Sequence, residues 1–160
     1  MTIKNPYLLF LGDAADQLAA KTAQGVKDWR PEWCLGQLRM ENCNADLGLP
    51  DIGLDAAYEK GARTLVIGIA NRGGVISDAW TKVLEQALRV GFDLAAGLHG
   101  RLVDVPVLRQ TAAELGRQLH DVRHPSASFS VASGERRPGK RILAFGTDCS
   151  IGKMYTMLAM

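Results

Sequence analysis

Short apolar runs alternate with amphipathic stretches along most of the chain. Four runs have the length and composition of buried parallel strands, and a shorter fifth follows them. They cover residues Tyr7–Leu11, Trp33–Leu38, Thr64–Ala70, Phe92–Leu98 and His120–Arg123. The third run is the richest in β-branched residues. The pattern predicts a set of short strands that cross one sheet.

The segments between these runs have helical periodicity. Apolar positions three or four residues apart predict four helices, Ala15–Val26, Leu54–Lys60, Ser77–Leu88 and Pro106–Leu119. Strands that alternate with helices indicate an α/β domain with a Rossmann-like, mainly parallel sheet and flanking helices. In such a sheet, ligands bind outside the carboxyl ends of the strands.

Three loops at predicted strand ends carry residues suited to binding. They are Gly12-Asp13, Asn71-Arg72-Gly73-Gly74 and His99-Gly100-Arg101. Arg72 could clamp a carboxylate or a phosphate, or be a surface arginine in a turn. His99 could be a general base, a substrate hydrogen-bond partner or a structural residue. None of the loops has the G-x-G-x-x-G spacing, so the fold gives no reason to expect a dinucleotide.

The end of the chain, Ile142-Leu-Ala-Phe-Gly-Thr-Asp-Cys-Ser-Ile-Gly-Lys153, is the most specific motif. An apolar run breaks into a glycine-containing loop that leads to a predicted helix start. Backbone N–H groups of such a loop wrap a phosphate, and the helix presents its positive end. The residues expected to hold the phosphate are Gly146, Thr147, Asp148, Cys149, Ser150, Ile151, Gly152 and Lys153. The alternative is an ordinary strand-to-helix turn.

Two departures from the G-x-x-x-x-G-K-[ST] pattern bear on the ligand. Thr147 stands at the first glycine position, and Met154 stands where a hydroxyl would bind Mg²⁺. Thr156 lies two residues too far along to replace that hydroxyl. Asp148 either positions a substrate or caps the loop.

The composition of the chain limits the classes of partner that it is expected to bind. The chain has 160 residues, 47% of them hydrophobic and 22% charged, and a net charge of +2 with both signs mixed along the sequence. It therefore gives no electrostatic argument for nucleic acid. The sequence contains no run of about 18 apolar residues, the length that a membrane-spanning helix needs. Three cysteines without C-x-x-C spacing favour a cytoplasmic location, and the histidines lack ligand spacing with them, so no metal site is predicted. The three tryptophans, Trp29, Trp33 and Trp80, are interpreted as core or interface residues.

The expected organisation has three parts. Residues 1–125 form the Rossmann-like domain, and residues 126–140, rich in Ser, Gly, Pro and charge, form a linker. Residues 141–160 supply the first strand, the phosphate loop and the helix start of a truncated P-loop domain. On this interpretation the sequence is a fragment whose activity requires a longer protein.

With the phosphate loop, the Asn71–Gly74 loop and the Ala96–His99 segment, the whole chain resembles the N-terminal part of a known two-domain family. That family joins a Rossmann-like N-terminal domain to a dethiobiotin-synthetase-like P-loop domain and includes D-glutamate N-acetyltransferases of the DgcN type. The resemblance implies transfer of an acetyl group from acetyl-CoA to the amino group of a D-amino acid, D-glutamate above all, in a homo-oligomer. The phosphate loop would grip a CoA phosphate, and Asn71, Arg72, Gly73, Gly74 and His99 would bind the substrate. His99 and Asp148 are the candidates for catalysis, and neither is a convincing general base.

Two alternatives stay open. The likeness to dethiobiotin synthetase alone suggests an ATP-dependent ligase or kinase, which would use ATP with Mg²⁺ and need the hydroxyl that Met154 does not supply. The second alternative is a non-catalytic module that binds a ligand or mediates dimerisation.

Overall fold

The computed structural model describes residues 3–70, 74–124, 138–146 and 152–160. The chain divides into two compact units, Met1–Ser126 and Ala127–Met160. Each unit is described by itself below.

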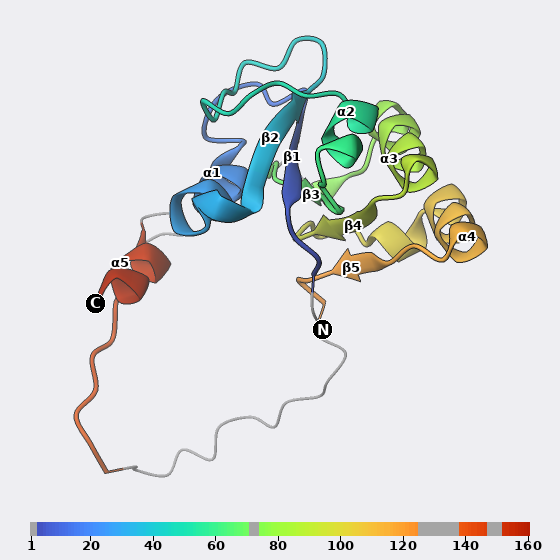
Figure 1. Ribbon diagram of the computed structural model, residues 1–160. Helices are drawn as coiled ribbons and strands as arrows, with labels where there is room; N and C mark the ends of the chain where they lie inside the picture. Colours follow the sequence, from blue (N-terminus) through green and yellow to red (C-terminus); the bar gives the residue numbers. More distant parts are fainter. Residues whose placement is uncertain (1–2, 71–73, 125–137, 147–151) are drawn as a thin grey trace. The chain divides into compact units, whose positions relative to one another are not determined.

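A five-stranded parallel sheet forms the centre of the first unit (Figure 1). Its strands are β1 (Tyr7–Gly12), β2 (Cys34–Arg39), β3 (Thr64–Ile67), β4 (Asp93–Ala96) and β5 (Leu119–Asp121), in the order β2-β1-β3-β4-β5. The strand β1 lies between β2 and β3, and Leu8 is opposite Gly36 on one side and Leu65 on the other. The predicted α/β class with a parallel sheet is confirmed.

Helices cover both faces of the sheet. They are α1 (Lys21–Trp29), α2 (Leu54–Glu59), α3 (Asp78–Val90) and α4 (Pro106–Leu115), with 3₁₀ turns η1 (Pro31–Trp33) and η3 (Leu102–Asp104). In Figure 1, α1 lies on the opposite side of the strands from α2, α3 and α4, as right-handed crossovers require. Among the described residues, no helix is long and apolar enough to cross a membrane.

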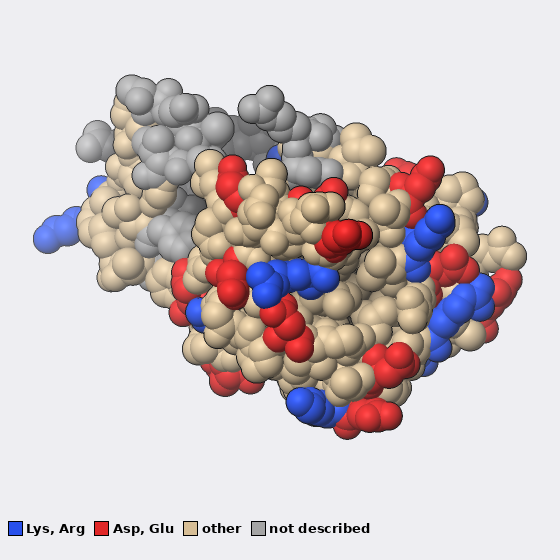
Figure 2. Space-filling model, turned by 90° about the horizontal axis from the view of Figure 1, so that it is seen from above, with Lys and Arg blue, Asp and Glu red and all other residues tan. Residues whose placement is uncertain are grey.

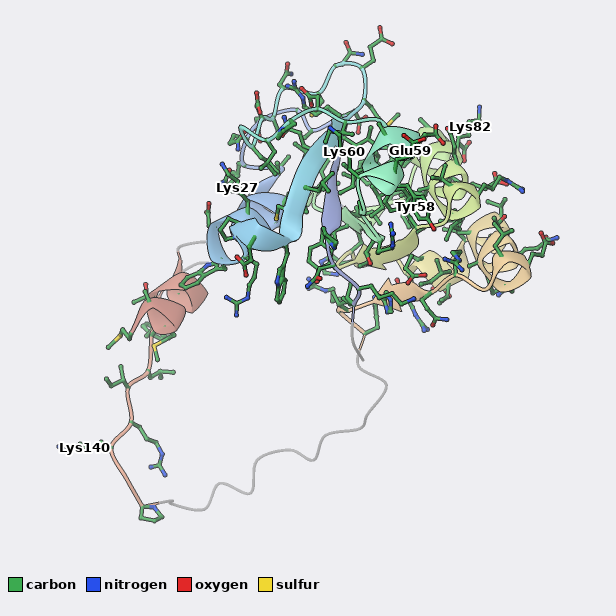
Figure 3. All side chains as sticks on the ribbon, viewed as in Figure 1. Lys27, Tyr58, Glu59, Lys60, Lys82 and Lys140 are labelled. Carbon is green, nitrogen blue, oxygen red and sulfur yellow. The ribbon has the colours of Figure 1, made fainter. Side chains whose placement is uncertain are left out.

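The core is built around β1, whose residues Leu8–Leu11 have no exposed surface. Helices on both faces explain why this strand is an uninterrupted apolar run instead of an alternating one. Phe10 meets the Trp80 ring edge-on at 5.7 Å, which anchors α3 on one face. Tyr58 of α2 meets Phe92 in the same way at 5.5 Å (Figure 3).

The first helix begins six residues later than its periodicity predicts. Residues 17–20 form turns, and α1 begins at Lys21 and not at Ala15. Asp16 explains the delay, because its Oδ1 accepts a 2.8 Å hydrogen bond from the Ala19 amide and stabilises the turn. Leu18, expected on the buried stripe, is 68% exposed.

The second unit contains α5 (Lys153–Ala159), which begins where the phosphate-loop motif predicts. Gly152 precedes it with a φ of +87°, a conformation that glycine adopts without strain. The strand predicted before the loop is not formed: residues 141–146 pair with no strand in the described residues. A strand needs a neighbour for its backbone groups, and here the side chains of Leu143 and Phe145 are each 84% exposed.

Candidate functional site

The carboxyl ends of five parallel strands meet at one edge of the sheet. The strand order changes direction between β1 and β3, and such a switch point leaves a crevice that ligands occupy in open α/β sheets. A cavity of about 480 Å³ lies there, and we call it the switch-point cavity. It is lined by Asp13, Ala15, Asp16, Ala19, Ile69, Ala70, Ser77 and Trp80.

Two of the lining residues, Asp13 and Trp80, are bonded to each other. The Trp80 indole N–H donates a 2.8 Å hydrogen bond to Asp13 Oδ1, and the indole is 2% exposed. Gly12 allows this packing, because a Cβ there would lie 2.9 Å from Trp80 Cε2 and the residue has a φ of +51°. Trp80 therefore orients the Asp13 carboxylate and leaves Oδ2 available. The Gly12-Asp13 turn was a sequence signal for this site, but the part played by Trp80, 67 residues away, was missed.

The other wall of the cavity forms where α1 approaches the end of β3. The Ala23 amide donates to the Gly68 carbonyl at 2.9 Å, and the Ala70 amide donates to the Ala19 carbonyl at 2.7 Å. A Cβ on Gly68 would lie only 2.2 Å from the Ala23 Cβ. The wall is therefore set by direct backbone contact between a helix and a strand end.

A second cavity, of about 430 Å³, lies at the end of β2 and has its charges paired. Arg39 Nε donates to Asp51 Oδ1 at 2.8 Å, and this bond lowers the pKa of the Asp51 carboxyl. Gln37, 1% exposed, donates to Asp46 Oδ1 at 2.8 Å, which lowers the pKa of that carboxyl. Lys27 of α1, labelled in Figure 3, donates to the Leu47 carbonyl of the segment between β2 and α2. These groups hold the segment between β2 and α2 in place.

Two of the predicted substrate loops contact each other. Gly74 has a φ of +62°, and a Cβ there would lie 2.8 Å from both the amide nitrogen and the Cβ of His99. The Gly100 amide donates to the Gly74 carbonyl at 3.3 Å. The His99 carbonyl lies 3.1 Å from His124 Nε2, and the His99 side chain is exposed. The other predicted residues of the first loop, Asn71, Arg72 and Gly73, lie outside the described residues.

The phosphate loop is described only at its two ends. Thr147, Asp148, Cys149, Ser150 and Ile151 lie outside the described residues. At the helix start, both the amide and the hydroxyl of Thr156 donate to the Gly152 carbonyl, at 2.9 and 3.0 Å. The Thr156 hydroxyl is thus used within the helix.

The described residues contain no group of three or more His, Cys, Asp or Glu side chains that could hold a metal ion. Figure 2 shows acidic and basic side chains interspersed over the face seen from above.

Comparisons with known proteins agree on the family. Residues 38–125 match the family described as a domain of unknown function, DUF1611_N, a Rossmann-like domain, and residues 130–160 match its P-loop partner, DUF1611_C. A solved structure of a DUF1611 family protein from Anabaena variabilis is 29% identical, with a TM-score of 0.78, over 99% of this chain and 48% of that one.

Two curated relatives carry the name D-glutamate N-acetyltransferase. The protein from Tritonibacter scottomollicae is 60% identical over 99% of this chain and 47% of its own length. The protein from a Pseudoalteromonas species is 43% identical over all of this chain and 48% of its own length. The chain thus spans about half the length of the curated relatives it matches. With more than half of its residues matched by the Rossmann-like model, the chain belongs to the DUF1611 family.

Proposed function

We propose that this chain is part of an acyltransferase that moves an acetyl group from acetyl-CoA to the amino group of D-glutamate. The observation that carries the proposal is the identity of 60% and 43%, over almost the whole chain, to two proteins named D-glutamate N-acetyltransferase. The matched region includes both the Rossmann-like unit and the phosphate-loop motif, so the likeness is not confined to a shared fold.

The reaction forms an amide bond and breaks a thioester. The free amine of the substrate attacks the acetyl carbonyl, CoA leaves as its thiol, and the ammonium proton must pass to a base or to solvent. In this proposal the loop Gly146–Lys153 holds a CoA phosphate through backbone N–H groups and the Lys153 ammonium. The position of Met154 supports an acyl donor over Mg-ATP, because CoA binding needs no metal hydroxyl there.

On the acceptor side, the proposal assigns the substrate to Asn71, Arg72, Gly73, Gly74 and His99. The contact between Gly74 and His99 supports a joint role for the two loops. A homo-oligomer in the cytoplasm remains a prediction. The cysteines bear only on the location: they lack disulfide or metal spacing in the sequence, and Cys34 and Cys43 are free thiols.

The test uses a protein of the relatives' full length that contains this chain. D-glutamate and acetyl-CoA are mixed with it, thiol release is followed, and N-acetyl-D-glutamate is identified by mass spectrometry, with L-glutamate as the stereochemical control. Lys153→Ala is expected to weaken acetyl-CoA binding about 10-fold or more, since a charge-assisted contact is lost. Lys140→Ala, which removes an exposed lysine outside the motif (Figure 3), is the matched control and should bind normally.

Two other results would replace the proposal. Saturable binding of Mg-ATP without acetyl-CoA binding would favour an ATP-dependent ligase or kinase. A folded protein that binds neither nucleotide nor CoA would indicate a ligand-binding or dimerisation module.

A further inference from the structure

We infer that the switch-point cavity binds the head group of an α-amino acid, with the ammonium on Asp13 and the carboxylate at the start of α3. This inference rests on the proposed function, which requires an amino-acid acceptor, and names where its reacting nitrogen is held. The Gly12-Asp13 turn is the strand-end loop to which that function assigned no role.

Two exposed carboxylates, those of Asp13 and Asp16, belong to the lining of the cavity. Asp13 Oδ1 accepts from Trp80 and Asp16 Oδ1 accepts from Ala19, which leaves the second oxygen of each carboxylate open. No ion pair joins either aspartate to another residue of the described ranges. In the cavity at β2, by contrast, Arg39 pairs with Asp51. Two carboxylates in one cavity favour a cationic ligand, and an ammonium group brings a positive charge together with N–H donors.

The start of α3 also lines the cavity. Helix α3 has 13 residues, and its N-cap Ser77 and its residue Trp80 both line the cavity. Ser77 Oγ accepts a 3.2 Å bond from the Trp80 amide, so its hydroxyl hydrogen can be donated to a ligand. The remaining first-turn amides and the positive end of the helix favour an anion, while the Asp78 carboxylate in the same turn acts against it. An α-amino acid carries both charges on one carbon, and this cavity offers both partners.

The rest of the lining suits a small ligand. Ala15, Ala19, Ile69 and Ala70 are apolar and short. A volume of about 480 Å³ falls in the range of small-molecule sites, in which a few placed polar groups fix orientation. Trp80, fixed by its contacts with Gly12 and Phe10, orients Asp13 before a ligand arrives.

The test compares binding to the 160-residue chain by titration calorimetry. The probes are D-glutamate, D-alanine and glutarate, which keeps both carboxylates of glutamate but lacks the ammonium. Asp13→Asn removes the charge yet keeps an oxygen that can accept from Trp80, and Asp16→Asn is the second variant. Asp28→Asn is the matched control, because it removes the same charge from an exposed carboxylate on α1 whose partner is Gln24.

We expect wild-type chain to bind D-glutamate at least about 10-fold more tightly than glutarate, and Asp13→Asn to abolish that preference while Asp28→Asn keeps it. Circular dichroism checks that the variants are folded.

The outcomes separate this inference from the proposed function. Asp13-dependent binding of D-alanine without binding of D-glutamate would keep the site and remove the proposed substrate. Acetylation of D-glutamate by the full-length protein, with a KM that Asp13→Asn and Asp16→Asn leave unchanged, would keep the function and overturn the inference. Absence of amino-acid binding to the folded chain would also overturn it.

Discussion

At the scale of single residues, His120 is a buried polar group with an incomplete set of partners. It lies in β5, is 5% exposed, and its Nδ1 has no hydrogen-bond partner in the part of the chain that the structure describes. Burial lowers the pKa of its imidazole, the nearby Asp93 carboxylate raises it, and Lys4 lowers it. Asp93 itself accepts from Lys4 at 3.2 Å and from the Gln118 amide at 2.9 Å. The net direction is downward, so folding favours the neutral ring.

This shift predicts a loss of stability in mild acid. Because the folded pKa lies below the unfolded one, the unfolded chain binds a proton first as the pH falls below about 6.5. The free energy of unfolding should therefore decrease from pH 7 to pH 5, by at most about 1.4 kcal/mol per pH unit for one proton. Urea titrations measure it. In His120→Gln, which has no titrating ring, this slope should be reduced.

The comparison variant is His124→Gln, which removes an imidazole from the nearby turn and should keep the wild-type slope. Asp46 and Asp51 do not interfere, since their lowered pKa values place their effect at a more acidic pH, where stability is lost as these carboxylates become protonated. An equal slope in His120→Gln and in wild type would contradict the assignment.

At the scale of elements, the position of α1 depends on a glycine, Gly68, which has no Cβ. Gly68 follows β3 directly, and Ala23 lies against it with its Cβ, Cα and amide nitrogen all within 3.1 Å of where a Cβ on Gly68 would stand. Gly68 also bonds β1, since its amide donates to the Phe10 carbonyl at 3.0 Å. Helix, loop and sheet therefore meet at a point with no free volume.

Gly68→Ala should consequently lower the free energy of unfolding by about 1–3 kcal/mol or more, the cost of overpacking a filled core. Ala23→Gly alone should cost about 1 kcal/mol through helix propensity. The double variant should be less destabilised than the sum of the two single variants, because removal of the Ala23 methyl group leaves room for the methyl group added at residue 68. Chemical denaturation of all four proteins measures the coupling, and strict additivity would show that the two sites do not clash.

At the scale of the whole molecule, the described apolar core belongs to the first unit. Among the residues whose burial the structure describes, the buried apolar side chains all fall between Tyr7 and Ala112. Ile142, Leu143 and Phe145 are exposed apolar residues of that second unit.

A chain shortened to residues 1–126 should therefore unfold cooperatively, with a free energy of unfolding within about 0.5 kcal/mol of the 160-residue chain. It should also bind less of a hydrophobic dye, because the exposed apolar side chains are gone. The double variant Leu143→Ser, Phe145→Ser in the long chain should lower dye binding to a similar degree. Loss of cooperative unfolding in the short chain would show that the second unit completes the core.

The parts of this molecule that the sequence could predict are those specified by local pattern. Helix α3 has an apolar stripe, a serine cap and a terminal glycine, and it forms where these signals place it. The start of α1 was wrong because one side-chain bond from Asp16 outweighed a weak periodicity. Residues 141–146, expected as the strand before the phosphate loop, pair with no strand among the described residues, because apolar composition alone does not supply a pairing partner.

The switch-point cavity was beyond the reach of local pattern. It depends on a bond between Asp13 and Trp80 and on the close approach of Ala23 to Gly68, contacts that only the strand order brings together. The sequence showed that strand ends carry residues suited to binding a ligand. It did not show which of these strand ends line a common cavity.

The bond from Trp80 to Asp13 also gives the protein an optical signal. The emission of an indole depends on the charge and polarity around its ring, and Trp80 is buried with a carboxylate on its N–H group. Trp29 and Trp33 are more exposed, and replacing both with phenylalanine leaves Trp80 as the only tryptophan of the chain. The emission of Trp80 in that variant should change when the charge of Asp13 is neutralised, so the measurement needs no attached label.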